Sequence, residues 1–343
     1  RIDSVDNAGL YPVGIVYSGV QVCTVTVLTG ETQGQSVSAN NYLNSALDKD
    51  KLYESDDTAW AMVQAGDKGL VVTLIDHYRA DVEGWMVALL SAALILFGGV
   101  IGCGALVSLV ASMVILWKLL IPLLLTGIDP ILACFVTVLV LTVIIDLLVA
   151  GFTKRCAVAL AGSVAGTLVT CISAYVLTYV LKLDGGDLPY VVPLLAQSSM
   201  KLDTRALYIG MIFLANSGAL MDLSMDVSVA CEEIHSKCPT LTHLELLKSG
   251  LTIGRGVLGT MTTTLMLAYS GNYLSMLMYF AGQGTPLLDI INLKYIASQL
   301  LNTLVGSFGL IAAAPLSALI ASRVYVHGKG AKRGIPAAES EKA

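Results

Sequence analysis

Four charged side chains lie inside stretches of the sequence that are otherwise almost entirely apolar: Asp146, Asp222, Asp226 and Arg255. A charged group at membrane depth is costly unless it is paired, hydrated or hydrogen-bonded. Carboxylates in such a setting can take up a proton, hold a small cation or pair with an arginine. These four residues are therefore the first candidates for a functional site.

The predicted helices bring the four charges to one level. Asp146 lies about one turn from the end of its helix, and Asp222 and Asp226 lie at a similar level on a second helix. Arg255 opens the next helix from the same side. Two interpretations stay open: Asp222 or Asp226 pairs with Arg255 to lock two helices together, or the layer is a functional site.

Further polar residues extend this layer. Ala215, Gly218, Asp222 and Asp226 are spaced i, i+3, i+7 and i+11, so they share one face of a helix. The triplet 216–218 is a point where that helix could bend or unwind, as helices at transport sites often do. The predicted substrate or ion site consists of Asp146, Asn216, Gly218, Asp222, Asp226, Arg255, Thr262 and Tyr269, with Lys118, Gln299 and Asn302 as weaker candidates.

The elements that must position these residues are membrane helices. Four stretches, Trp85–Trp117, Cys156–Leu181, Gly256–Leu288 and Tyr295–Ser322, contain no Asp, Glu, Lys or Arg, and about 20 apolar residues suffice to span a bilayer. Hydrophobic residues make up 55% of the chain and charged ones only 13%, far from the usage of soluble domains. The fold class is therefore a polytopic α-helical membrane protein.

About seven transmembrane helices are expected in the region 84–327. Glycines between Phe97 and Ala105 predict a tight turn between the first two helices, and the small residues of the fourth predict a packing face. Leucines at helical spacing predict a separate interfacial helix over 240–253, lying on the membrane surface. The predicted spans are 85–97, 106–125, 130–151, 156–181, 206–231, 255–281 and 295–325.

Residues 1–83 are predicted to form a small soluble domain. The run from Val20 to Leu28 is rich in β-branched residues and alternates in the pattern of a half-buried strand, which ends at Gly30. Gly69–Ile75 is predicted to form a second strand. The polar segment Asn44–Asp57 reads as a loop. A small barrel of the OB or SH3 type would suit this length. Its surplus of acids argues against nucleic acid as a partner.

Basic residues between the spans predict the orientation in the membrane. They follow the third, fifth and seventh helices, and the positive-inside rule places them in the cytoplasm. The β domain is then extracytoplasmic, and a basic cytoplasmic tail covers 328–343. Because the sequence starts with Arg1, we also expect a signal or anchor segment before it.

Several segments resemble one known family. They are Asp76–Arg79, Gly151–Thr153, Gly218–Ser228, Gly254–Met261, Leu265–Gly271 and Asn302–Leu310. Together they resemble the YibE/F family of bacterial multi-pass membrane proteins, and the β region resembles that of its longer YibE-type members. The resemblance implies a protein of the bacterial cytoplasmic membrane, preceded by an anchor helix and related to transport.

The sequence favours a transporter or channel for a small solute or ion. A scaffold acting through the β domain and the surface helix is the alternative, with a second copy or another membrane protein as its partner. An intramembrane aspartyl protease using Asp146 and Asp222 is less favoured, because neither acid has the Tyr-Asp or Gly-x-Gly-Asp context. The chain contains no Walker A, HExxH, CxxC or GxSxG motif, so we expect neither a cofactor nor an enzymatic activity.

Overall fold

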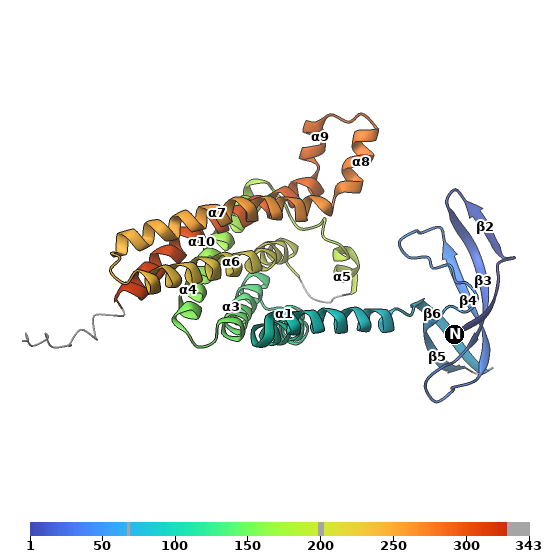
Figure 1. Ribbon diagram of the computed structural model, residues 1–343. Coiled ribbons are helices and arrows are strands. Elements are labelled where there is room, and N and C mark those ends of the chain that lie inside the picture. Colours follow the sequence, from blue (N-terminus) through green and yellow to red (C-terminus); the bar gives the residue numbers. More distant parts are fainter. Residues whose placement is uncertain (67–68, 198–201, 328–343) are drawn as a thin grey trace, which may run out of the picture. The chain divides into compact units, whose positions relative to one another are not determined.

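The computed structural model describes residues 1–66, 69–197 and 202–327 (Figure 1). The chain divides into two compact units between Ala93 and Leu94. The first unit contains all the strands of the described chain, and the second contains nearly all of its helices. The predicted cytoplasmic tail, 328–343, lies outside the described residues.

Two antiparallel sheets make up the N-terminal unit. The long strand β3 (Val16–Thr26) pairs along one edge with both β1 (Ile2–Asp6) and β2 (Leu10–Val13), and along the other with β4 (Ser36–Asn44). Strands β5 (Ala59–Gly66) and β6 (Gly69–His77) form a separate hairpin. The two strands predicted from alternation are therefore present, as parts of β3 and β6.

An OB or SH3 type is not confirmed for this unit. Its hairpin β5–β6 packs against β4 without joining the first sheet, so the strands lie in two sheets. The core between them contains Cys23 and Val25 from β3, Ala39 from β4 and Val72 from β6. Because the period of a strand is two residues, the intervening Val22 and Thr24 face outward.

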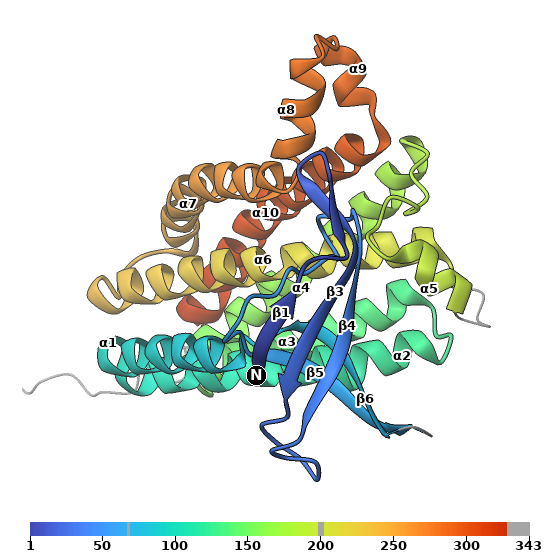
Figure 2. The ribbon, with the colours of Figure 1, turned by 90° about the vertical axis from the view of Figure 1, so that its right-hand side faces the viewer.

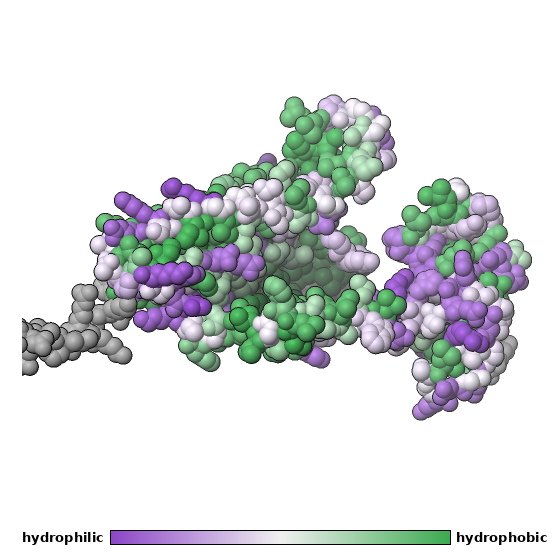
Figure 3. Space-filling view, viewed as in Figure 1, coloured by the Kyte–Doolittle hydropathy of each residue, from purple (hydrophilic) through white to green (hydrophobic). Residues whose placement is uncertain are grey.

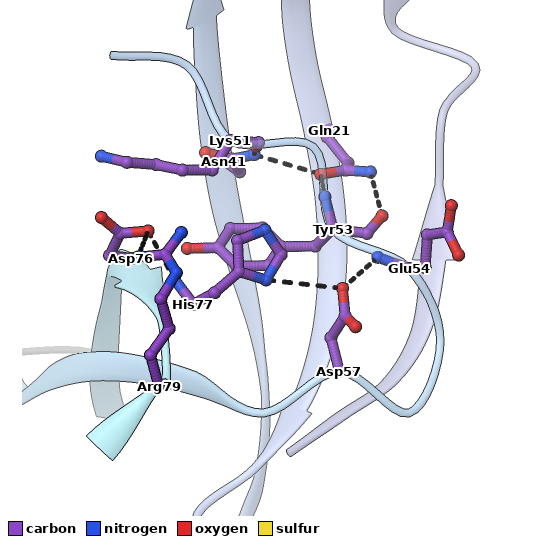
Figure 4. Close-up of polar contacts among 9 residues, drawn as sticks. All are labelled: Gln21, Asn41, Lys51, Tyr53, Glu54, Asp57, Asp76, His77 and Arg79. Carbon is purple, nitrogen blue, oxygen red and sulfur yellow. Dashed lines mark hydrogen bonds and ion pairs between the residues drawn. The ribbon is translucent and has the colours of Figure 1, made fainter. Parts of the chain in front are cut away.

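A buried amide holds the loop between β4 and β5 in place (Figure 4). Gln21 is fully buried, and its Nε2 donates to the carbonyl of Tyr53 at 2.8 Å. Its Oε1 accepts from the Tyr53 N–H and from Asn41 Nδ2, both at 3.1 Å. Burial also raises the pKa of the Tyr53 hydroxyl to about 12. Gln21 thus provides the backbone of this loop with the hydrogen bonds that a neighbouring strand would otherwise provide.

We expect Gln21→Leu to loosen this loop strongly. The change leaves both backbone groups of Tyr53 buried without a partner, which costs roughly 2–3 kcal/mol. Hydrogen exchange of the Tyr53 amide in the full chain should then accelerate by about 30- to 150-fold. The exposed Gln33 offers a matched control, because Gln33→Leu removes no such contact. Unchanged exchange in Gln21→Leu would contradict this role.

Five long helices pack together at the centre of the helical unit, as Figure 1 illustrates. They are α3 (Pro130–Ala150), α4 (Lys154–Val180), α6 (Thr204–Lys237), α7 (His243–Gly271) and α10 (Lys294–His327). Shorter helices are α5 (Val191–Gln197), α8 (Leu274–Gly282) and α9 (Leu287–Asn292). Helices α8 and α9 stand away from the central helices as a short hairpin (Figure 2).

The predicted turn in the first apolar stretch is present as a break inside α1 (Ala80–Ile115). Gly99 has φ 54° and ψ −126°, which is not helical. A Cβ added to Gly102 would lie 2.0 Å from the carbonyl oxygen of Leu94. Eight residues of straight helix would separate these positions by about 12 Å, so the chain folds back sharply here. A π-helical turn at Leu116–Leu120 then leads into α2 (Ile121–Leu125).

Small residues allow the central helices to approach closely. A Cβ at Gly162 of α4 would meet Ser317 Oγ at 2.0 Å, and one at Gly166 would meet the Ala313 Cβ at 2.8 Å. Gly250 of α7 meets Cys231 and Ala318 in the same way. Close backbone packing of this kind is how helices associate in lipid. The packing face predicted for 156–181 is therefore present at Gly162 and Gly166, whereas Ala157 and Ala161 of the same predicted face are exposed.

The predicted interfacial helix over 240–253 is wrong. Residues from His243 to Gly271 form one continuous helix, which begins with a capping box between Thr242 and Glu245. Gly250 and Gly254 did not break it, because they are the positions at which it packs on α10. The end of the predicted span 255–281 is also wrong, since the helix stops earlier, at Gly271, and the separate helix α8 follows.

Five helical segments of the described chain are long and apolar enough to cross a membrane. Apolar side chains cover most of the visible face of the helical unit, and polar ones gather where α6 ends and α7 begins (Figure 3). Phe97 is fully exposed, which is costly in water and ordinary in lipid. The five segments are Ala80–Leu125, Pro130–Ala150, Lys154–Val180, Thr204–Lys237 and Lys294–Val326, so seven spans are not confirmed by this measure.

Candidate functional site

The candidate site follows one face of α6. Asp203 caps the start of this helix by accepting from the N–H groups of Arg205 and Ala206. The predicted face, Ala215, Gly218, Asp222 and Asp226, is exposed along its whole length, whereas the neighbouring residues Asn216, Ser217 and Ser224 are buried. The helix runs unbroken through 216–218, so the predicted bend is wrong. A regular helix therefore presents two carboxylates on an open face.

Asp146 of α3 lies beside this face. Its side chain is only 2% exposed, and its Oδ2 has no hydrogen-bond partner among the described residues. The charge of Asp146 interacts with that of Asp222, and Asp222 interacts in turn with Asp226. Asp222 thus lies within electrostatic range of both other acids, because α3 and α6 run parallel from the level of Gly210, which packs on Cys134.

Arg255 does not pair with these acids. It lies on α7 one residue beyond Gly254, and its side chain is exposed. Among the described residues, no ion pair joins Arg255 to Asp146, Asp222 or Asp226. The sequence predicted correctly which helix carries Arg255, but the predicted ion pair with Asp222 or Asp226 is wrong. An architectural lock through Arg255 therefore has no contact to support it.

Asn216 is the centre of a second polar group, nearer the Asp203 end of α6. It is fully buried, and its Nδ2 donates to the carbonyl of Ile212 at 2.8 Å. It also contacts the carbonyl of Asn302 on α10 at 3.5 Å, and its Oδ1 accepts from the Tyr269 hydroxyl of α7 at 3.3 Å. Three helices meet at this amide. Thr262 lies half-buried on the same face of α7 as Tyr269, two turns away.

A cavity of about 370 Å³ opens at the Asp203 end of the same face of α6. It begins at Met211 and Ala215, the two residues that precede Gly218 along the open face. Two oxygens in its lining, Asp187 Oδ1 and Asn302 Oδ1, have no partner within the described chain. The lining residues are Asp187, Leu188, Pro189, Tyr208, Met211, Ala215, Asn272, Tyr295, Gln299 and Asn302.

Sequence reasoning missed most of this cavity. Gln299 and Asn302 stood out as polar residues in an apolar span, but Asp187 and Asn272 lie in segments that connect helices, and Tyr295 lies at the start of α10. The positions of Asp187 and Asn272 carried no signal, because the cavity forms only when α6, α10, the end of α7 and the loop after α4 converge. The spacing of Tyr295, Gln299 and Asn302 by four and three residues was the one clue.

Contacts at both ends of the bundle hold the helices around the open face. At the Asp203 end, Lys294 donates to Asp184 and holds the pKa of that carboxyl below its usual value. At the Lys237 end, Arg155 pairs with Glu232, and Ser228 Oγ lies 2.9 Å from the Tyr325 hydroxyl. Within the described ranges, no group of three or more His, Cys, Asp or Glu side chains is placed to hold a metal ion.

Comparison with known proteins gives one result. No curated protein matches the chain, and no solved structure matches it. The family model described as YibE/F-like protein matches residues 86–327. The match covers the helical region and begins after the last strand of the β unit. With well over half of its length matched, the chain belongs to the YibE/F-like family of membrane proteins.

Proposed function

We propose that the protein is a transporter or channel for a small solute or ion, which moves along the open face of α6. The observation that carries this proposal is the pair of exposed carboxylates, Asp222 and Asp226, on an apolar membrane helix. Ionisable groups at membrane depth are retained for function by default. Buried Asp146 beside them adds a third group that can take up a proton or cation.

The contacts between the helices support a polypeptide chain that crosses the membrane seven times. The sharp reversal at Gly99 would divide the first apolar stretch into two crossings. Helix α7 would add another, since Gly254 packs at the level of Val227 and Tyr269 reaches Asn216, which makes it antiparallel to α6. Its apolar part is rich in glycine and threonine, which suits a helix that lines a polar path rather than lipid.

Seven crossings would put the two ends of the chain on opposite sides, and the positive-inside rule would then place the β unit outside the cell and the C-terminal end in the cytoplasm. We expect a cysteine introduced at Ser36, in a variant that lacks the native cysteines, to react with a membrane-impermeant maleimide added to intact cells. A cysteine at the exposed Ser236 should react only after the cells are opened. Labelling of Ser36→Cys only in opened cells would contradict this orientation.

The remaining functions have less support. The scaffold hypothesis depended partly on a surface helix, and that segment is instead part of α7. A protease would need Asp146 and Asp222 to reach one substrate, yet one is buried and the other exposed. We therefore propose a role without catalysis, in which the bilayer and a small solute or ion are the partners.

Ion flux in reconstituted vesicles tests the proposal. Purified protein in liposomes is placed on a solid-supported membrane, and concentration jumps of Na⁺, K⁺, Mg²⁺, ammonium, butylammonium and protons are applied in turn. We expect a transient current for at least one cation that is absent from protein-free vesicles. The absence of current for every cation and for the anions chloride and butyrate would overturn the proposal.

A further inference from the structure

The cavity at the Asp203 end of α6 is suited to a ligand of one charge type. Among the described residues that line it, Asp187 is the single acid, and none is Lys, Arg or His. In this described lining, an anion would therefore meet a carboxylate and no compensating cation. A cationic ligand would instead gain a charge-assisted hydrogen bond.

The cavity also has acceptors that its own residues leave unused. Asp187 Oδ1 and Asn302 Oδ1 are buried atoms without a hydrogen-bond partner in the described chain. An unpaired buried acceptor costs roughly 1–3 kcal/mol, which a donor placed in the cavity would recover. Tyr208 is not such a donor, because its hydroxyl already donates to the Ser298 carbonyl at 2.8 Å.

Size and lining favour an organic cation over a metal ion. A volume of about 370 Å³ lies in the range of small-molecule sites. A hard metal ion requires about six oxygen ligands, whereas this cavity offers a single carboxylate and three amides among Leu188, Met211 and two tyrosine rings. Apolar and aromatic walls suit the hydrocarbon part of an ammonium compound, and the faces of the tyrosine rings attract its charge.

We propose that this cavity binds a small organic ammonium ion through Asp187 and Asn302. Its place at the start of the open face makes it the entry site for Asp222, which lies seven residues, or about 10 Å, beyond Ala215 on the same helix. The role as an entry site rests on the proposed transport function. Binding itself does not, and it is measured without flux.

Three probes of one shape separate charge from size. Butylammonium, 1-butanol and butyrate are titrated into the full chain in detergent, and binding is followed by saturation-transfer NMR. We expect butylammonium to bind at least about tenfold more tightly than butanol, a difference of about 1.4 kcal/mol. Butyrate should not bind. Equal binding of the three probes, or displacement of butylammonium by an equal concentration of Na⁺ or Mg²⁺, would overturn the proposal.

Variants connect the binding to the cavity. Asp187→Asn should lower the affinity for butylammonium about tenfold. Asp289→Asn is the matched control, because Asp289 is an exposed acid on α9 outside the cavity. Ala215→Phe fills the cavity without a change of charge and should abolish binding. Full affinity in both Asp187→Asn and Ala215→Phe would overturn the proposal, while flux that depends on Asp222 would still support transport.

Discussion

Replacing Asp222 with Asn is expected to reduce cation currents in reconstituted vesicles to the level of protein-free vesicles. The substitution keeps the size of the side chain but removes the charge at the middle of the three-acid group formed with Asp146 and Asp226. The side chain is exposed and makes no ion pair within the described chain. Stability should therefore change by about 0.5 kcal/mol or less, as for other surface substitutions.

A control on the same helix distinguishes charge at the site from charge in general. Glu233→Gln removes one acid near the Lys237 end of α6, where Glu233 forms an exposed ion pair with Lys237. Such pairs contribute little to stability, and Glu233 lies seven residues, or about 10 Å, beyond Asp226 along the same face, away from Asp146 and Asp222. We expect normal currents and normal thermal unfolding in this variant. Loss of current in both variants would point to a general effect of negative charge.

Arg255→Gln tests the competing interpretation, a lock between two helices. Because Arg255 is exposed and unpaired with the three acids in the described chain, its replacement should leave the unfolding temperature within about 2 °C. A lock predicts a loss of several degrees in each single variant. It also predicts recovery in the double variant Asp222→Asn with Arg255→Gln, because the buried charge then disappears. That pattern would contradict the open face as a site.

Several features of the fold were predictable because they depend on short stretches of sequence. The turn at Gly99, the alternation in β3 and the small residues Gly162 and Gly166 each carry a local signal. The end of α7 and the continuity of that helix through Gly250 do not. There, glycines that would weaken an isolated helix are the contact points with α10, so tertiary packing decides the outcome.

The candidate site was predictable in part for the same reason. Helical spacing alone placed Ala215, Gly218, Asp222 and Asp226 on one face, and the alternating direction of the spans brought Asp146 to the same level. The contact of Arg255 could not be predicted, because the rotation of α7 about its axis follows from the fit of Gly250 and Gly254 against Ala318 and Ala314. The cavity depends on a loop whose position is set by Lys294 and Asp184.

Gly306→Ala is expected to destabilise the helical unit, because α10 crosses α6 at Asn216 with no room for a side chain. A Cβ on Gly306 would lie 2.0 Å from Asn216 Oδ1. The added methyl group must displace a fully buried amide that bonds to α7 through Tyr269. Overpacking of this kind costs about 1–3 kcal/mol. Unfolding in mixed micelles, followed by circular dichroism, measures the loss.

The double variant Asn216→Ala with Gly306→Ala decides whether the cause is this one contact. Asn216→Ala alone also destabilises, since it leaves the Tyr269 hydroxyl without its partner at a cost of roughly 1–3 kcal/mol. Together the two changes place a methyl group in the space that the amide vacates, so we expect a favourable coupling of about 0.5–3 kcal/mol. Gly256→Ala serves as the control, because a Cβ there has no neighbour within 4 Å. Strictly additive losses in the double variant would show that Asn216 and Gly306 do not set the spacing of α6, α7 and α10.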